Sequence, residues 1–197
     1  MLAGRPMLEW SLEALLAVDE IEHVVVALPA GVTAPHGTIG VTGAEQRSGS
    51  VLAALRAAPP DDVVLVHDAA RPLLAPELAR DVLGALASED CDGAIAAAPV
   101  TDKIKEAVGV EVVRTLERGR LWAVQTPQAF HRPMLERALG AAPDALAAAT
   151  DDASLVEAAG GTVRVVPAPR ENLKVTTPLD LRLAELLLAE RAGARRR

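Results

Sequence analysis

Two charged side chains, Asp68 and Arg71, follow a short run of apolar residues at positions 63–66. Such an unbroken run is typical of a strand that is buried on both faces of a parallel sheet. Ligands of open α/β sheets bind beyond the carboxyl ends of the strands, where these two side chains are expected. A carboxylate there suits a metal ion, and a guanidinium suits a phosphate. The alternative interpretation is a turn with a helix-capping Asp and a solvated Arg.

A loop of small residues at positions 43–50 runs into a predicted helix. The first turn of a helix has free backbone N–H groups and the positive end of the helix dipole, which suit a nucleotide or a phosphate. A Ser at this place is also a common helix cap, so the loop alone does not decide between a binding site and a cap.

Two further cationic side chains lie near segments that are expected to be loops. Arg118 has the geometry to pair with a phosphate through two N–H groups, and its alternative is a solvated surface position. Lys174 stands between the last predicted strand and the last predicted helix. A Lys there would act on a phosphate as a mobile point charge.

Composition excludes several classes of protein. The net charge of −7 argues against non-specific binding of nucleic acid, and the three aromatic residues, Trp10, Trp122 and Phe130, are too few for a base-stacking surface. With Cys91 as the single cysteine, a disulfide framework or a cysteine zinc site is not expected. No apolar run is long enough to span a bilayer and no signal peptide is recognised, so a cytoplasmic protein without a membrane partner is predicted.

Motif searches narrow the chemistry further. The sequence has no Walker loop, no dinucleotide fingerprint, no serine nucleophile elbow and no metalloprotease helix motif. Its four histidines are scattered without the spacing of metal ligands, and His67 is interpreted as a packed loop residue rather than a base.

The predicted elements alternate between strands and helices, which indicates a parallel sheet with helices on both faces. At 197 residues, one domain is the simplest organisation. The predicted strands span residues 23–28, 38–41, 61–67, 93–100 and 162–166. The predicted helices span residues 8–18, 48–57, 76–88, 133–139 and 178–191, with one more after residue 152.

Residues 101–116 break this alternation. Charged and apolar residues alternate around Gly109, which predicts a β-hairpin. A hairpin that projects from the body cannot bury its own apolar face and would gain from a partner. The alternative is a hairpin that folds back on its own sheet.

Taken together, these motifs resemble the 2-C-methyl-D-erythritol 4-phosphate cytidylyltransferase family. The matching blocks run in family order along nearly the whole chain, at residues 3–6, 43–51, 66–72, 98–100, 121–122, 126–128, 150–154 and 172–176. Ribitol-5-phosphate cytidylyltransferases share much of this set, but the block at residues 67–71 is more similar to the isoprenoid enzyme.

The resemblance implies a Rossmann-like nucleotidyltransferase domain over residues 1–197, with a hairpin arm at about residues 101–118. The implied reaction transfers CMP from CTP to 2-C-methyl-D-erythritol 4-phosphate in the non-mevalonate pathway of isoprenoid biosynthesis. Two alternatives stay open, which are a ribitol-5-phosphate cytidylyltransferase and a truncated, non-catalytic nucleotide-binding remnant.

The resemblance also implies a role for each matching position. The residues around the CTP would be Gly43, Arg47, Ser50 and Ala69. The residues of the sugar-phosphate pocket would be Arg71, Thr126 and Thr150. Asp68 would hold a Mg²⁺ ion that bridges the triphosphate. The catalytic residues would be Arg118 and Lys174, which orient the incoming phosphate.

In the family the hairpin arm exchanges with a second subunit, so the resemblance implies a homodimer in which Arg118 serves the partner's site. Two departures from the family pattern stand out. Lys103 occupies a position where the family usually has a Thr. Family members also begin with a strand and a glycine-rich loop that this sequence does not contain. We therefore expect impaired turnover and lowered stability for the chain as written.

Overall fold

A four-stranded sheet forms the centre of the computed structural model, which describes residues 1–88, 90–141, 146 and 149–194. The strands lie in the order β3 (Val63–Val66), β7 (Trp122–His131), β4 (Gly93–Pro99) and β8 (Val163–Pro167). β4 and β8 are parallel, whereas β7 is antiparallel to both β3 and β4. Three of the four strands therefore share one direction, as expected for a mostly parallel sheet, but the sequence did not predict β7.

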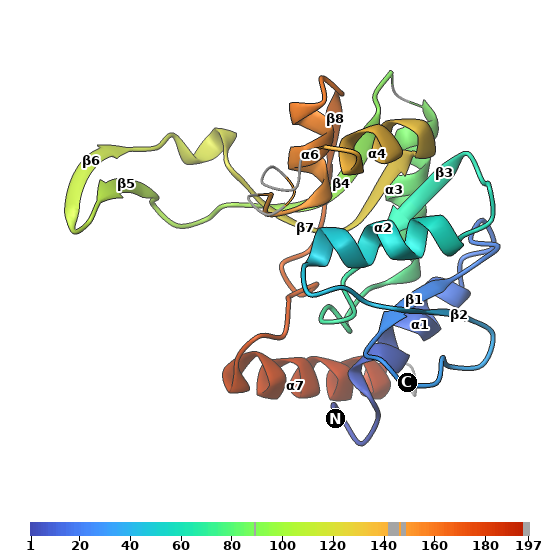
Figure 1. Ribbon diagram of the computed structural model, residues 1–197. Coiled ribbons are helices and arrows are strands. Elements are labelled where there is room, and N and C mark those ends of the chain that lie inside the picture. The colour runs from blue at the N-terminus through green and yellow to red at the C-terminus, as the bar shows by residue number, and fades with distance from the viewer. Residues whose placement is uncertain (89, 142–145, 147–148, 195–197) are drawn as a thin grey trace.

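Helices cover both faces of this sheet (Figure 1). Along β4, Ala94 and Ala96 pack in one buried cluster with Val82 of the helix on one face. Ile95 belongs to a second cluster with Leu135 from a helix on the other face. The alternation of side chains along a strand produces these two cores. The helices concerned are α2 (Arg47–Ala57), α3 (Pro76–Ser88), α4 (Arg132–Leu139) and α6 (Asp152–Ala158).

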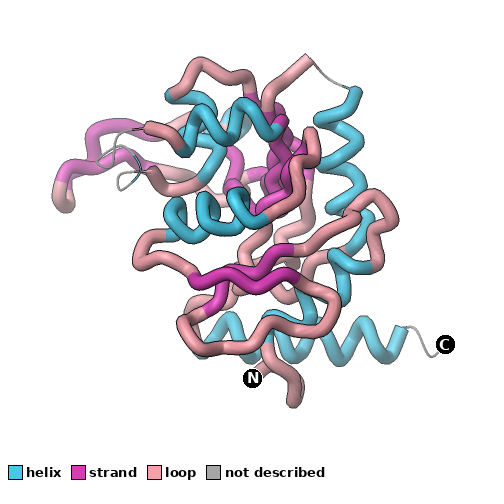
Figure 2. The backbone as a smooth tube through the Cα atoms, turned by 45° about the vertical axis from the view of Figure 1, so that its right-hand side comes forward, coloured by secondary structure: helices cyan, strands magenta, loops and turns pink. Residues whose placement is uncertain are grey.

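A second sheet, separate from the first, contains only β1 (Val25–Leu28) and β2 (Ile39–Thr42), which are parallel (Figure 2). Among the described strands, β1 pairs only with β2 and β3 pairs only with β7. Each of these strands therefore has one edge without a partner strand.

The predicted hairpin arm is confirmed. β5 (Lys105–Val108) and β6 (Glu111–Thr115) pair with each other and join no other strand of the described chain. All residues of both strands are exposed, and the arm projects away from the body (Figure 1). Gly109 lies in the connecting turn with φ +59°, a conformation that glycine adopts without steric cost. The alternative of a hairpin folded back on its own sheet is therefore wrong.

Two helices outside the sheet layers pack near the amino terminus. They are α1 (Met7–Leu16) and α7 (Pro178–Ala194). A small core of Leu2, Leu73 and Ala184 joins the amino-terminal segment to α7. The leucines of α7 that share one face in the sequence pattern are mostly exposed, at Leu179, Leu183 and Leu186. None of the helices in the described part of the chain is long and apolar enough to cross a membrane.

Candidate active site

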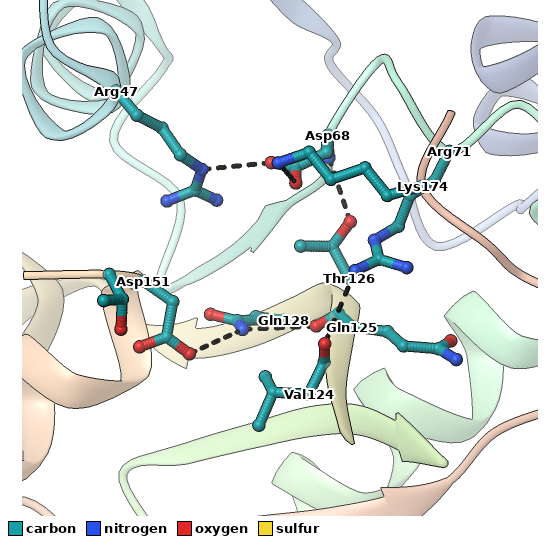
Figure 3. A pocket seen from close by; sticks show the side chains of 10 residues that line it. Arg47, Asp68, Arg71, Val124, Gln125, Thr126, Gln128, Asp151 and Lys174 are labelled. Carbon is teal, nitrogen blue, oxygen red and sulfur yellow. Dashed lines mark hydrogen bonds and ion pairs between the residues drawn. The ribbon is translucent and has the colours of Figure 1, made fainter. Parts of the chain in front are cut away.

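A pocket of about 220 Å³ opens beside the carboxyl end of β3 (Figure 3). Six of the ten predicted site residues line it, namely Arg47, Asp68, Arg71, Thr126, Thr150 and Lys174. They come from segments that lie up to 127 positions apart in the sequence, from residue 47 to residue 174. The fold therefore brings most of the predicted site together at one place.

Asp68 lies between two cations in this pocket. Its Oδ1 atom is 3.0 Å from Nε of Arg47, and its Oδ2 atom is 2.9 Å from Nζ of Lys174. Burial alone would raise the pKa of the Asp68 carboxyl, but the hydrogen bond from Lys174 and the charge of Arg47 outweigh it and lower that pKa. Asp68 is therefore a carboxylate at neutral pH.

Arg47, the first residue of α2, bridges two carboxylates. Its Nη1 atom lies 2.7 Å from Oδ2 of Asp152, whose side chain is only 1% exposed. Burial raises the pKa of Asp152, although the Arg47 charge opposes this shift. For Arg47 itself, burial lowers the pKa, but the charges of Asp152 and Asp68 reverse this effect and the pKa is raised. The guanidinium is thus held, fully charged, between the end of β3 and the start of α6.

The turn from Asp68 to Arg71 connects the pocket to the segment after β8. The N–H of Arg71 donates to the carbonyl of Asp68 at 2.9 Å, which closes the turn. The N–H of Val175 donates to the carbonyl of Ala70 at 2.7 Å, and this bond places Lys174 beside the turn. These backbone bonds explain why Asp68 and Lys174, which are distant in sequence, meet in the pocket.

Four other lining residues were not predicted, and they are Val124, Gln125, Gln128 and Asp151. Three of them lie on β7, the strand that the sequence pattern missed. Gln128 donates to Oδ2 of Asp151 at 3.2 Å, and Asp151 caps α6 by accepting from the N–H of Ser154. Gln128 and Asp151 lie inside the family-like blocks at residues 126–128 and 150–154, which were the available signal for these two residues.

The other predicted site residues lie outside this pocket. Gly43 lies in the loop before α2 and Ser50 in the first turn of that helix, where the Ser50 hydroxyl accepts from the N–H of Ala44 at 2.9 Å. A Cβ atom at Gly43 would come within 3.2 Å of that hydroxyl, so the loop packs closely here. Ala69 is exposed in its turn. The exposed Arg118 donates to a backbone carbonyl at the base of the arm, 2.6 Å away.

A metal ion would have few protein ligands here. No group of three His, Cys, Asp or Glu side chains in the described part of the chain could hold one. A lone carboxylate such as Asp68 nevertheless fits Mg²⁺, because this ion is commonly bound by one or two carboxylates together with substrate phosphates and water. A carboxylate accepts about four hydrogen bonds or ligand contacts, and Arg47 and Lys174 use two of these positions.

Comparison with known proteins identifies the family. The family model for 2-C-methyl-D-erythritol 4-phosphate cytidylyltransferase (IspD) matches residues 1–190. A relative of that name from Azoarcus sp. is 42% identical over 207 residues, which cover 98% of this chain and 86% of the relative. Another from Rubrobacter xylanophilus is 52% identical over 135 residues, which cover 68% of this chain and 58% of the relative.

Solved structures agree with this family. The crystal structure of 2-C-methyl-D-erythritol 4-phosphate cytidylyltransferase from Thermus thermophilus superposes with a TM-score of 0.83 at 35% identity, covering 96% of this chain and 92% of that one. A 4-diphosphocytidyl-2C-methyl-D-erythritol synthase from Anaerococcus prevotii also gives a TM-score of 0.83, at 27% identity, covering 96% and 91% of the two chains. This chain therefore belongs to the 2-C-methyl-D-erythritol 4-phosphate cytidylyltransferase family.

Proposed function

We propose that this chain transfers CMP from CTP to 2-C-methyl-D-erythritol 4-phosphate and releases pyrophosphate. The observation that carries this proposal is the cluster of Arg47, Asp68 and Lys174 in one pocket of a chain that belongs to this family. Arg71 adds a third cation beside them. Three cations around one carboxylate suit a ligand that carries several phosphate groups.

In the proposed reaction, a phosphate oxygen of the sugar phosphate attacks the α-phosphorus of CTP in line with the departing pyrophosphate. The new P–O bond forms as the bond to pyrophosphate breaks, and pyrophosphate leaves with the bonding electrons. No covalent intermediate with the protein is needed. The protein accelerates such a reaction mainly by positioning the reactants and stabilising developing negative charge.

The pocket's own residues can supply both effects. Arg47 and Lys174 are held by Asp68 until substrate phosphates compete for their N–H groups. Side chains that the fold already holds in place cost no reorganisation during the reaction.

We propose Asp68 as the protein ligand of a Mg²⁺ ion that arrives with the triphosphate. When bound, Mg²⁺ neutralises negative charge on the phosphates. The support for this assignment is the position of the Asp68 carboxylate, which lines the pocket with two cations within 3.0 Å.

A cytoplasmic location also stays a prediction from the sequence.

We also propose that two copies of the chain associate through the arm. Four valines on the arm, Val108, Val110, Val112 and Val113, are exposed. A second copy that covered them would bury this apolar surface. In such a dimer, Arg118 of each copy would reach the other copy's pocket and contact the incoming phosphate.

Pyrophosphate release tests the reaction directly. CTP is supplied with 2-C-methyl-D-erythritol 4-phosphate in one reaction and with D-ribitol 5-phosphate in a matched one. We expect release with the methylerythritol substrate and little with ribitol phosphate. Release with ribitol phosphate only would assign the chain to the other cytidylyltransferase activity, and CTP binding without release would support a non-catalytic remnant.

A further inference from the structure

A chain of hydrogen bonds runs through two side chains from the backbone of Asp68 to the backbone of Arg71. The N–H of Asp68 donates to Oγ1 of Thr126 at 3.0 Å, a contact visible in Figure 3. The same oxygen lies 3.1 Å from Nδ1 of His67. At the other side of the ring, Nε2 of His67 lies 3.2 Å from the carbonyl oxygen of Arg71. The ring therefore ties together both ends of the turn that carries Asp68 and Arg71.

The groups at the two ends of this series of hydrogen bonds determine which atom donates in each bond. The carbonyl oxygen of Arg71 can only accept, so Nε2 of His67 must carry a proton. A neutral imidazole has one N–H, so Nδ1 must accept, and the Thr126 hydroxyl must donate to it. An imidazole with the ordinary pKa of about 6.5 is mostly neutral at pH 7.5, where the ring is examined below.

The Thr126 hydroxyl consequently has no proton left for a ligand. One of its two lone pairs accepts from the N–H of Asp68, which leaves a single acceptor position. Thr126 lines the pocket, so this acceptor position is available on the ligand side. A phosphate oxygen offers no proton to such a position, whereas a hydroxyl of a sugar alcohol does.

We propose that His67 is a positioning residue that makes Thr126 a hydrogen-bond acceptor for a hydroxyl of the acceptor substrate. By the same contacts, His67 holds the turn from Asp68 to Arg71 in its shape. This proposal rests on the proposed function, because it assigns the hydroxyl group to the sugar phosphate that receives CMP. In this proposal Thr126 binds a hydroxyl of the substrate, whereas the cations of the pocket bind the phosphates.

The protonation of the ring can be measured without any turnover. Long-range ¹H–¹⁵N NMR spectra of protein with labelled histidine distinguish a protonated ring nitrogen from a bare one. At pH 7.5 we expect a protonated Nε2 and a bare Nδ1 for His67, with its signals assigned by their loss in His67→Gln. The exposed His36, changed to Gln, should remove a different set of signals. A protonated Nδ1 at His67 would overturn the proposal.

A double-mutant cycle tests whether His67 acts through Thr126. His67→Gln retains an N–H that can reach the Arg71 carbonyl but removes the acceptor for Thr126, and Thr126→Val removes the hydroxyl. Each single variant should raise KM for 2-C-methyl-D-erythritol 4-phosphate roughly tenfold, while KM for CTP changes less. The double variant should be no worse than Thr126→Val alone.

Independent, multiplicative effects of the two changes would show that His67 does not act through Thr126, which contradicts the proposal. His36→Gln is the matched control and should leave both KM values unchanged. Failure of the proposed function is recognised separately, because the unaltered chain would then release no pyrophosphate from these substrates. The NMR result decides the direction of the hydrogen-bond chain in that case too.

Discussion

The side chains of the pocket are paired with one another, whereas those of the arm are mostly exposed. In the pocket, Asp68 is paired with both Arg47 and Lys174, which come from distant parts of the sequence. On the arm, Val110 is fully exposed, and Arg118 makes its hydrogen bond to the base of the arm itself. The pocket is therefore organised by contacts between distant segments of the chain, whereas the contacts of the arm stay within the hairpin and its base.

In the proposed dimer, this difference indicates which part of the site a second copy would complete. The pocket cations are already oriented, and their ion pairs are partly shielded from water, where such pairs are screened less than on the surface. The arm exposes an apolar surface and a cation that its own chain does not use in the pocket. A dimer that brings each Arg118 to the partner's pocket uses both features at once, and the following predictions test this division of roles.

The largest effect is expected for Asp68→Asn. The amide keeps the shape of the side chain but removes the charge that faces Arg47 and Lys174 and that we propose binds Mg²⁺. We expect the rate of pyrophosphate release to fall by at least about a hundredfold. The melting temperature should change little, because Arg47 keeps its contact with Asp152. Asp81→Asn, on an exposed position of α3, is the matched control. Unchanged dependence of the rate on Mg²⁺ in Asp68→Asn would rule Asp68 out as the ligand.

Val110→Asp should separate the copies while leaving each chain folded. The side chain is fully exposed, so a charge there costs little within one copy but is unfavourable at an apolar interface. Sedimentation velocity should show a shift from dimer to monomer, and turnover should fall by about a hundredfold because the partner's Arg118 is lost. Val32→Asp, at another exposed valine, should change neither measurement. A dimer that persists in Val110→Asp would place the interface elsewhere.

The smallest effect concerns stability at low pH. Burial lowers the pKa of His67 from 6.5 to about 4, with smaller opposing contributions from its neighbours. Between these two values the unfolded chain binds a proton at this residue and the folded chain does not, so stability falls as the pH decreases from 6.5 to 4. The total loss is about 3 kcal/mol, from 1.36 kcal/mol per pKa unit.

Urea unfolding of the unaltered chain and of His67→Gln at several pH values isolates this contribution. The stability of His67→Gln should fall less steeply over the interval, and His36→Gln should keep the original slope. Parallel curves for the unaltered chain and His67→Gln would show that His67 takes up its proton equally well in the folded state.

The sequence predicted an element correctly where the spacing of its apolar residues follows which side chains are buried. The helix at residues 76–88 has its predicted bounds, because a Pro begins it and apolar residues repeat along one face. β7 was missed because Gln125, Thr126 and Gln128 give it the polarity of a loop. In the structure these side chains are buried and bonded to other polar groups, for example Asn172 to Gln125 at 2.8 Å. Polarity predicts exposure only where no such partner exists.

The site was predicted only in part, for a related reason. The motifs indicated Asp68 as a metal ligand and Arg71 and Lys174 as phosphate-binding residues. Only the folded chain shows that Lys174 contacts Asp68. The same motifs did not indicate that His67 determines which groups Thr126 can bind. The role of His67 depends on one hydrogen bond to the nearby Arg71 and on a second to Thr126 of the adjacent strand. A local sequence pattern does not contain the second bond.

The most direct test of a site shared between two copies is a mixing experiment with Asp68→Asn and Arg118→Ala chains. Arg118→Ala alone should lower turnover by about a hundredfold and change the affinity for CTP little. If the arm exchanges, each mixed dimer has one site with both defects and one with neither. Equimolar random mixing should then restore pyrophosphate release to about a quarter of the unaltered level, because half of the dimers are mixed and each has one intact site. Mixed dimers that are demonstrated by mass spectrometry yet show no recovered release would contradict the account, since each copy would then use its own Arg118.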